Sequence, residues 1–180
     1  MQIHGIDERR SSLRRPRFAL STGAHLSRHP MAHELSFPDG YTLSDAPAKF
    51  DVGHAHRWIS EQSYWAKGIP LPVFEKACAN SLLAGAYAAD GSLAGMARVV
   101  TDRATFAWVC DVFVDEAHRG FGLGKRLVGF LKAHPDLQGL RRMHLATRDA
   151  HALYAQFGFV PLTGADRWME IRDLDPYRRA

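Results

Sequence analysis

The amino-acid sequence predicts an α/β fold in which a mixed, mainly antiparallel sheet is flanked by helices. Apolar residues alternate with a period of two over residues 82–114, which indicates an antiparallel meander of three strands. Apolar residues at helical spacing precede and follow this meander, and one more strand-like segment separates the two downstream helices. With 180 residues, of which 46% are hydrophobic, the chain can bury the core of one globular domain.

Short elements precede the meander. A strand is expected to begin at Tyr41, after a Pro-Asp-Gly turn. Residues 51–63 predict a helix that Asp51 caps at its N-terminus. A loop with the sequence SYWAKGIP follows, and a second helix is expected over about residues 72–79.

The meander contains the segments LLAGAYA, LAGMARVV and TFAWVCDVFV, and an Asp-Gly turn joins the first two, as is typical of a hairpin. A helix is expected to begin at Phe121 and to end before Pro135, because proline cannot continue it. Its apolar stripe consists of Leu123, Leu127, Phe130 and Leu131.

Further elements are predicted downstream. Residues 141–147 (RRMHLAT) have the apolar character of a central strand. Residues 148–157 predict a helix that Gly158 closes in a left-handed conformation. Residues 158–162 and 166–174 are expected to form a last pair of short strands.

The net charge of +4 resides in the first part of the chain. Residues 1–30 carry six arginines against two acids, whereas the rest carries 17 basic and 17 acidic residues, so no basic surface for nucleic acid is expected. We predict a basic, disordered leader over residues 1–35 and a single domain over residues 36–180. The composition of the leader has a faint similarity to a transit peptide, but a tail or a start codon upstream of Met31 is the simpler interpretation.

Cysteine content and hydropathy bear on location. Cys78 and Cys110 both lie in apolar segments, which is typical of buried thiols in a reducing compartment, so a cytoplasmic location is expected. No apolar run approaches the roughly 20 residues of a membrane span, and no membrane partner is expected. His54 and His56 stand two apart on a predicted helix and face different ways, so no metal site is expected.

A glycine-rich stretch, RGFGLGKR, stands between the last strand of the meander and the next helix. Its pattern is Arg-x-x-Gly-x-Gly, formed by Arg119, Gly122 and Gly124. Bare backbone at a helix N-terminus points several N–H groups into one concavity, and Lys125 and Arg126 add positive charge. The stretch therefore predicts an anion site that suits a pyrophosphate. An ordinary glycine-rich turn with surface cations is the alternative interpretation.

Two known phosphate-binding loops do not fit this stretch. A P-loop requires four residues between its glycines and a hydroxyl after the lysine, but three residues separate Gly120 from Gly124, and Arg126 replaces the hydroxyl. The Gly-x-Gly-x-x-Gly pattern of dinucleotide-binding folds also fails, because the third glycine is absent.

The segment CDVFVDEAHRGFGLGKRLV resembles the acetyl-CoA loop of the GNAT superfamily of N-acetyltransferases, whose pattern is Arg/Gln-x-x-Gly-x-Gly/Ala after a long strand. A second segment, ALYAQFGFV, is similar to the family's Tyr-x-x-x-Gly-Phe motif, here Tyr154, Gly158 and Phe159. The resemblance spans roughly residues 41–172. It implies the GNAT acyl-CoA N-acyltransferase fold and transfer of an acetyl group from acetyl-CoA to a primary amine, by direct attack in a ternary complex and without a metal.

The resemblance also implies which residues bind the cosubstrate. Backbone groups of one strand hold the thioester arm, the glycine loop holds the pyrophosphate, and one helix flanks the sulfur. Thr147 stands where many members carry an asparagine that touches the cofactor, and it can still donate a hydrogen bond. The implied residues are Val112, Phe113, Val114, Arg119, Gly120, Phe121, Gly122, Leu123, Gly124, Lys125, Thr147 and Phe157.

Tyr154 is the catalytic acid that the resemblance implies. A phenol has a pKa slightly above that of a thiol and can share its proton with the leaving thiolate. The alternative is a helix residue that merely packs on the sheet.

Asp111 is the best candidate for the base that deprotonates the amine. It is expected to share a strand face with Val109 and Phe113, an unusual place for a carboxylate. A structural acid satisfied by an arginine or by backbone is an equal alternative, as is a water relay to the amine. His144 and His118 are weaker candidates.

The acceptor is expected to meet the SYWAKGIP loop, where Tyr64 and Trp65 form an aromatic wall and Lys67 can meet a carboxylate. Alternatively, Trp65 only plugs the end of the sheet. A small-molecule amine, an amino acid and a peptide N-terminus stay open as acceptors, and a homodimer is compatible with this fold. A CoA-binding sensor without turnover and a nucleic-acid binder that uses the leader are the rival functions.

Overall fold

The computed structural model describes residues 32–177. Of the leader predicted over residues 1–35, residues 1–31 lie outside the described residues. The first strand, β1 (Glu34–Ser36), includes the last two residues of that predicted leader, and this strand was not predicted. No helix among residues 32–177 is long and apolar enough to cross a membrane.

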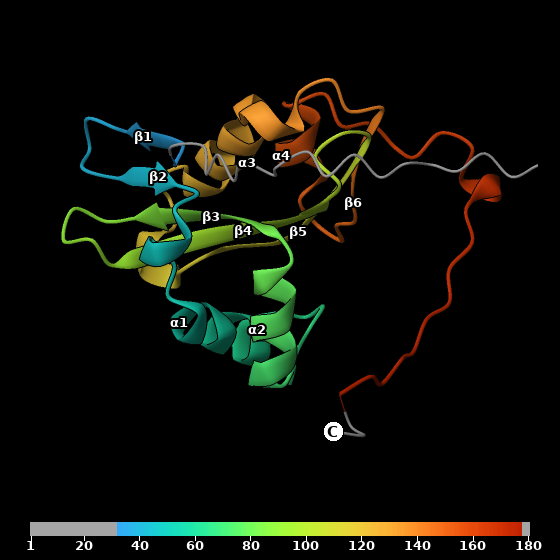
Figure 1. Ribbon diagram of the computed structural model, residues 1–180, viewed down its shortest axis with the longest axis horizontal. Helices are drawn as coiled ribbons and strands as arrows, with labels where there is room; N and C mark the ends of the chain where they lie inside the picture. The colour runs from blue at the N-terminus through green and yellow to red at the C-terminus, as the bar shows by residue number, and fades with distance from the viewer. Residues whose placement is uncertain (1–31, 178–180) are drawn as a thin grey trace, which may run out of the picture. The chain divides into compact units, whose positions relative to one another are not determined.

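A sheet of six strands forms the centre of the described domain, in the order β1-β2-β3-β4-β5-β6 (Figure 1). The first five strands are antiparallel to their neighbours, and β6 is parallel to β5, which confirms the mixed, mainly antiparallel sheet and its meander. The strands after β1 are β2 (Thr42–Ser44), β3 (Leu82–Tyr87), β4 (Leu93–Thr101), β5 (Phe106–Val114) and β6 (Arg142–Leu145).

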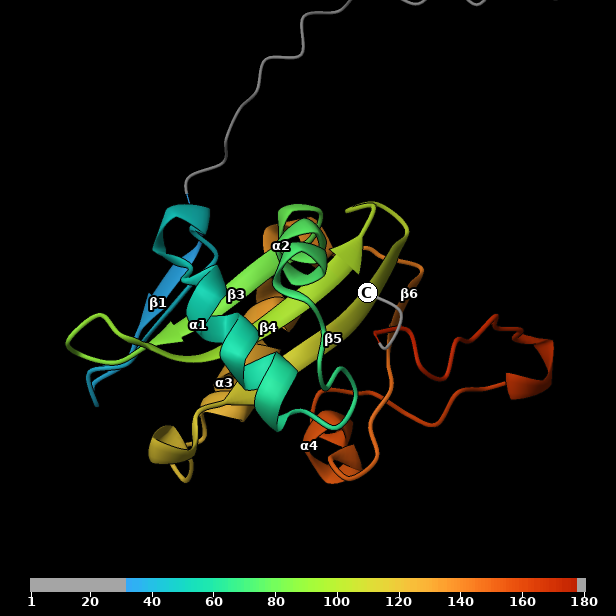
Figure 2. The same cartoon turned by 90° about the horizontal axis from the view of Figure 1, so that it is seen from below.

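Helices cover both faces of the sheet (Figures 1 and 2). On one face lie α1 (Val52–Arg57), which continues as a π-helical turn (Trp58–Gln62), and α2 (Leu71–Ala79). On the other lie α3 (Leu123–Ala133) and α4 (His151–Ala155). Short 3-10 turns are formed by Pro47–Lys49, Glu116–His118, Pro135–Leu137 and Ala165–Arg167. Asp51 caps α1, as predicted, because its Oδ1 accepts from the N–H of His54.

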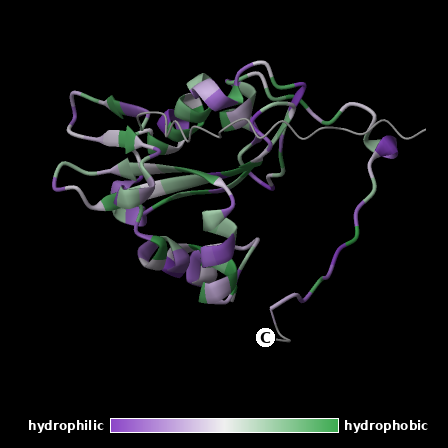
Figure 3. Ribbon diagram, in the orientation of Figure 1, coloured by the Kyte–Doolittle hydropathy of each residue, from purple (hydrophilic) through white to green (hydrophobic). Residues whose placement is uncertain are grey.

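Each face of the sheet carries its own hydrophobic core. The α1–α2 side buries Trp58, Phe74, Met96 and Phe113, and the α3 side buries Leu127, Phe130 and Val109. Figure 3 shows hydrophobic residues along the central strands and alternating hydrophobic and hydrophilic residues on α1 and α2, as expected for amphipathic helices.

A β-bulge interrupts β5. The extra residue reverses the face of the sheet on which the following side chains lie, so Phe113 belongs to the core on the α1–α2 side, whereas Val109 belongs to the core on the α3 side. The expectation that Asp111 shares a face with both Val109 and Phe113 is therefore wrong, because strict alternation ignores the bulge.

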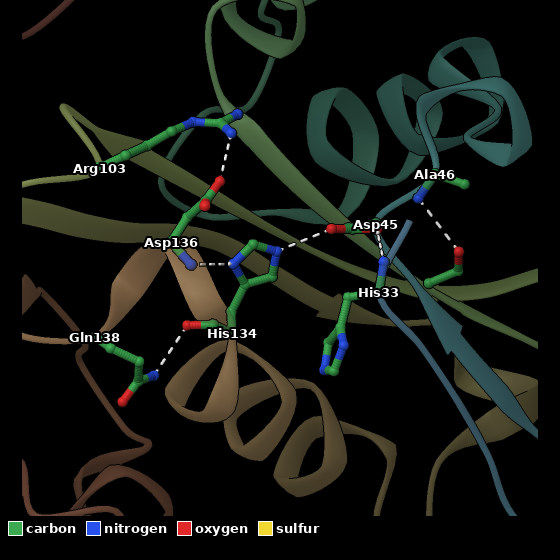
Figure 4. A network of polar contacts seen from close by, with 8 residues as sticks. His33, Asp45, Ala46, Arg103, His134, Asp136 and Gln138 are labelled. Atoms are coloured by element: carbon green, nitrogen blue, oxygen red, sulfur yellow. Dashed lines mark hydrogen bonds and ion pairs between the residues drawn. The ribbon is translucent and has the colours of Figure 1, made fainter. Parts of the chain in front are cut away.

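A polar network fastens the C-terminus of α3 to the chain that follows β2 (Figure 4). The Nδ1 atom of His134 accepts from the N–H of Asp136 at 3.1 Å, and Nε2 lies 2.8 Å from Oδ2 of Asp45. Oδ1 of Asp45 accepts from the N–H of His33 at 2.7 Å. This network fixes the helix at the end opposite to the glycine loop.

Two predictions about the last third of the chain are wrong. β6 lies at the edge of the sheet and not at its centre, because β5 is its one strand partner among the described residues. Residues 158–174 form no strands, since Pro161 and the left-handed Gly164 (φ 69°) interrupt them and no ladder partner is present. The helix of residues 148–157 is shorter than predicted, but Gly158 closes it with φ 85°, as expected.

Candidate functional site

β5 and β6 separate halfway along β5. Their parallel ladder runs only from Phe106–Arg142 to Val109–Leu145, and β5 then continues to Val114 without β6 beside it. A cavity of about 560 Å³ lies at this separation. Residues 108–112 of β5 and residues 146–150 after β6 line it, together with Tyr64, Trp65, Tyr154 and Arg172.

The glycine loop presents free backbone donors at the start of α3. Arg126 is the first residue of this helix whose N–H bonds to a preceding carbonyl, that of Gly122. The six preceding amides, from Gly120 to Lys125, donate to no acceptor among residues 32–177. Consecutive unpaired N–H groups at a helix N-terminus form an anion site, and the residues present thus fit a pyrophosphate.

Glycine is required in this loop by its backbone conformation. Gly120 and Gly122 have φ angles of 87° and 73°, which residues with a Cβ atom adopt only with strain. No atom lies within 4 Å of a Cβ built on either residue, so the space in front of the loop is open.

Arg119 and Arg126 flank the loop but act within the fold. Arg126 forms a bidentate ion pair with Asp39 at 2.6 and 2.9 Å and stacks on Phe37, 4.4 Å from the ring centroid. That Arg126 adds charge for the anion stays a prediction, and Asp39 compensates part of that charge. Arg119 donates from Nε to the carbonyl of Val114 at 3.2 Å, and Lys125 is exposed.

Tyr154 projects from α4 into the cavity and is 9% exposed. Its hydroxyl makes no hydrogen bond within the described part of the chain. Burial raises the pKa of the Tyr154 phenol, and the nearby Tyr64 and Asp149 raise it further. A buried phenol that keeps its proton and has no internal partner can act as a proton donor.

Asp111 lies in the cavity wall with both carboxylate oxygens occupied. Oδ2 accepts from Nε of Arg98 at 2.6 Å, and Oδ1 accepts from Nε1 of Trp65 at 2.9 Å. NH1 of Arg98 donates in turn to the hydroxyl of Ser81 at 3.0 Å. These contacts favour the structural interpretation of Asp111 over that of a base.

Tyr64 and Trp65 lie together at the cavity, as the sequence suggested, with ring centroids 4.9 Å apart. The Tyr64 hydroxyl accepts from the N–H of Arg148 at 3.1 Å, and the Arg148 guanidinium lies 3.9 Å from the Tyr64 ring centroid. The loop between α1 and α2 is thereby fastened to both separated strands, to β5 through Asp111 and to the chain after β6 through Arg148. Lys67 is exposed and does not line this cavity.

Of the other residues that the resemblance implies, some line the cavity and others pack elsewhere in the fold. Val112 lines the cavity, whereas Phe113 is buried and Val114 packs partly against the core on the α3 side. Thr147 lines the cavity, and its hydroxyl accepts from the N–H of Ala150 at 3.0 Å. The Phe157 ring packs on α3, 3.4 Å from where a Cβ on Gly129 would lie.

The two weaker histidine candidates lie apart from each other. His144, on β6, lines a second, mainly apolar cavity of about 750 Å³ that adjoins the first at Tyr154. Burial lowers the pKa of His144, and the positive charge of Arg142 lowers it further. His118 instead bonds through Nδ1 to the hydroxyl of Tyr41 at 2.9 Å.

Sequence reasoning missed three arginines: Arg148 and Arg172, which line the cavity, and Arg98, which binds Asp111 in its wall. No local sequence pattern distinguishes them, so only the fold could bring them together. No group of three or more potential metal ligands occurs among residues 32–177.

Comparisons with known proteins agree with this geometry. The sequence profile of the Acetyltransferase (GNAT) family matches residues 44–159. The structure of a Xanthomonas campestris protein described as belonging to the GNAT family is similar with a TM-score of 0.73 and 42% identity, over 82% of this chain and 99% of that one. A Gibberella zeae protein assigned to the acetyltransferases is 27% identical over 64% of this chain and 76% of its own length.

A more distant solved structure shows the same fold. The ribosomal-protein-S18-alanine N-acetyltransferase from Escherichia coli is similar with a TM-score of 0.54 and 21% identity, over 68% of this chain and 79% of that one. The profile covers more than half of the chain, and its range contains both the glycine loop and Tyr154. The chain therefore belongs to the GNAT family of acetyltransferases, whose members use acetyl-CoA as cosubstrate.

Proposed function

We propose that this protein is an N-acetyltransferase that moves the acetyl group of acetyl-CoA to a primary amine by direct attack in a ternary complex. The observation that carries the proposal is the row of six unpaired amides from Gly120 to Lys125, next to a separated strand pair. A reducing, cytoplasmic location fits the free thiols of Cys78 and Cys110. Assembly as a homodimer stays a prediction.

Acetyl-CoA, when bound, would supply an activated thioester and its thiolate leaving group. The amides of residues 120–125 would hold its diphosphate, because they offer unpaired donors at the positive end of α3. The backbone of Val112 and Val114, which has no β6 neighbour, would bind the pantetheine arm and supply an N–H donor for the developing oxyanion. Thr147 and Phe157 are proposed to contribute on the α4 side.

Tyr154 is proposed to hold the proton that the leaving thiolate requires. Its raised pKa keeps the phenol protonated at neutral pH, and its hydroxyl has no competing partner among the described residues. General acid catalysis of this kind contributes typically about 10²- to 10⁴-fold to the rate.

The amine is proposed to lose its proton to water in the open cavity. Asp111 serves as a positioning residue in this account, since Arg98 and Trp65 occupy its oxygens. Tyr64 and Trp65 are proposed as the wall that the acceptor contacts. The name of the Escherichia coli neighbour specifies an alanine of ribosomal protein S18 as its acceptor. A peptide N-terminus therefore stays among the proposed acceptors, beside small-molecule amines and amino acids.

The experiment that tests this function measures CoA release from acetyl-CoA with a panel of amines, amino acids and short peptides. Turnover with at least one acceptor, together with acetylated product by mass spectrometry, is expected. Binding of acetyl-CoA without turnover across the panel would favour the CoA-sensor alternative. Unchanged activity after removal of residues 1–30 is expected too, because the proposed site lies entirely within residues 32–177.

A further inference from the structure

The cavity where β5 and β6 separate contains more positive charge than the chemistry of amine transfer requires. Its charged lining residues are Asp111, Arg148, Asp149 and Arg172. Asp111 is already neutralised by Arg98, at 2.6 Å. Nη2 of Arg148 lies 3.5 Å from Oδ2 of Asp149, and both side chains are more than 60% exposed, so their charges compensate each other only weakly. Arg172 is thus left as an excess cation at the cavity.

Arg148 is held in an orientation that suits recognition of a carboxylate. Its guanidinium lies 3.9 Å from the centroid of the Tyr64 ring, and its own N–H fixes the Tyr64 hydroxyl. A guanidinium that stacks on an aromatic ring keeps the N–H donors at its edge free to point outward. Those donors form a planar fork that matches the two oxygens of a carboxylate.

Arg172 reaches the cavity because the C-terminal segment is anchored on both sides of it. Before Arg172, the Trp168 ring lies 4.6 Å from the His144 ring on β6 and 5.4 Å from the Arg142 guanidinium. After Arg172, Tyr177 packs against the core on the α1–α2 side. The segment accordingly passes from the side of β6 to the side of α2 (Figure 1).

From this arrangement we infer that the acceptor is an amine that also carries a carboxylate, which Arg148 and Arg172 bind while the amine faces Tyr154. This inference rests on the proposed N-acetyltransferase function. A dianionic phosphate fits less well, because Asp149 also lines the cavity and repels a second negative charge. Tyr64, Trp65 and Trp108 favour an acceptor whose remaining part is apolar.

The test compares acceptors that differ only in the carboxylate, for example phenylalanine, phenylalaninamide and phenethylamine, with a phosphorylated amine as a further arm. The expected result is a kcat/KM for phenylalanine about 10- to 100-fold above those of the two analogues without a carboxylate, as follows from the loss of charged hydrogen bonds. Arg148→Gln and Arg172→Gln should each raise the KM for phenylalanine more than the KM for the two analogues or for acetyl-CoA. Arg167→Gln, a neighbouring exposed arginine that does not line the cavity, serves as the matched control.

Calorimetry with N-acetylphenylalanine, the expected product, gives a readout independent of turnover and should show weaker binding to both cavity variants. Equal rates for the three analogues, preference for the phosphorylated amine, or variants that act alike on all acceptors would overturn the inference and leave the N-acetyltransferase function standing. Binding of acetyl-CoA without acetylation of any amine would overturn both.

Discussion

The indole Nε1 of Trp65 donates a hydrogen bond of 2.9 Å to Oδ1 of Asp111, across 46 residues of sequence. The same carboxylate forms a buried ion pair with Arg98, whose side chain is 16% exposed against 7% for Asp111. Asp111, at the bulge of β5, therefore positions Trp65 in the aromatic wall of the cavity, and Arg98 holds Asp111 in place.

Asp111→Asn should destabilise the protein by about 3 kcal/mol, because it leaves the buried charge of Arg98 without a partner. The double variant Asp111→Asn/Arg98→Met removes both charges and should recover at least half of that loss in chemical denaturation. If Asp111 acts only by positioning Trp65, the double variant keeps kcat within a few-fold. A large decrease of kcat in the double variant, despite its recovered stability, would instead identify Asp111 as the base.

Gly122→Ala should weaken acetyl-CoA binding about tenfold or more, because a Cβ atom at φ 73° strains the loop and projects into the anion site. Gly91→Ala is the matched control, since Gly91 has φ 84°, equally open surroundings and a place in the turn between β3 and β4. Both variants should lose about 1 kcal/mol of stability, and only Gly122→Ala should lose affinity in calorimetry. Equal affinity for the two variants would argue against the glycine loop as the binding site.

Most of the fold was predictable because local chemistry and tertiary structure agree. The apolar segments of β3, β4 and β5 and the stripe of α3 each match residues that the structure buries. The glycine loop was predictable for the same reason, since its chemistry resides in consecutive residues.

The features that escaped prediction depend on contacts between distant residues. No local pattern marks the bulge at Asp111, which is specified by the pairing of β5 with β4. Residues 166–174 alternate like a strand, yet a strand also needs a neighbour, and Met169 and Ile171 are 97% and 105% exposed. Arg98 and Arg148 become functional candidates only when the fold brings them to Asp111 and Tyr64.

Tyr154→Phe should lower kcat about 100-fold without changing the affinity for acetyl-CoA, because it removes only the proposed proton donor. Tyr87→Phe is a suitable control: burial raises the pKa of Tyr87 to about 12, and its hydroxyl is buried without a partner among the described residues. Removing that hydroxyl should leave kcat unchanged and maintain or raise the melting temperature.

The pH profile gives a second test of Tyr154. Burial raises its pKa above the ordinary value of a phenol, so the phenol stays protonated across the neutral and mildly alkaline range. No decrease of kcat attributable to Tyr154 is expected in that range, and loss of its proton should lower kcat only at strongly alkaline pH. A basic limb near pH 8 that disappears in Tyr154→Phe would contradict this assignment.

Neither cysteine should form an acetyl-enzyme. Burial raises the pKa of Cys110, which lines the cavity, to about 12, and that of Cys78 to about 11, so both are thiols at neutral pH. Intact-mass measurement after incubation with acetyl-CoA alone should show unmodified protein, and Cys110→Ser should keep its kcat. A stable acetylated protein that Cys110→Ser abolishes would indicate a two-step mechanism through that thiol.

We propose that main-chain amides at the start of α3 bind the diphosphate of coenzyme A. This binding can be followed in amide NMR spectra recorded during titration with coenzyme A, and separately with pantetheine, which lacks the diphosphate. Large shifts are expected for the amides of Gly120, Gly122 and Gly124 with coenzyme A, and little change is expected there with pantetheine. Unperturbed loop amides in the presence of saturating coenzyme A would contradict it.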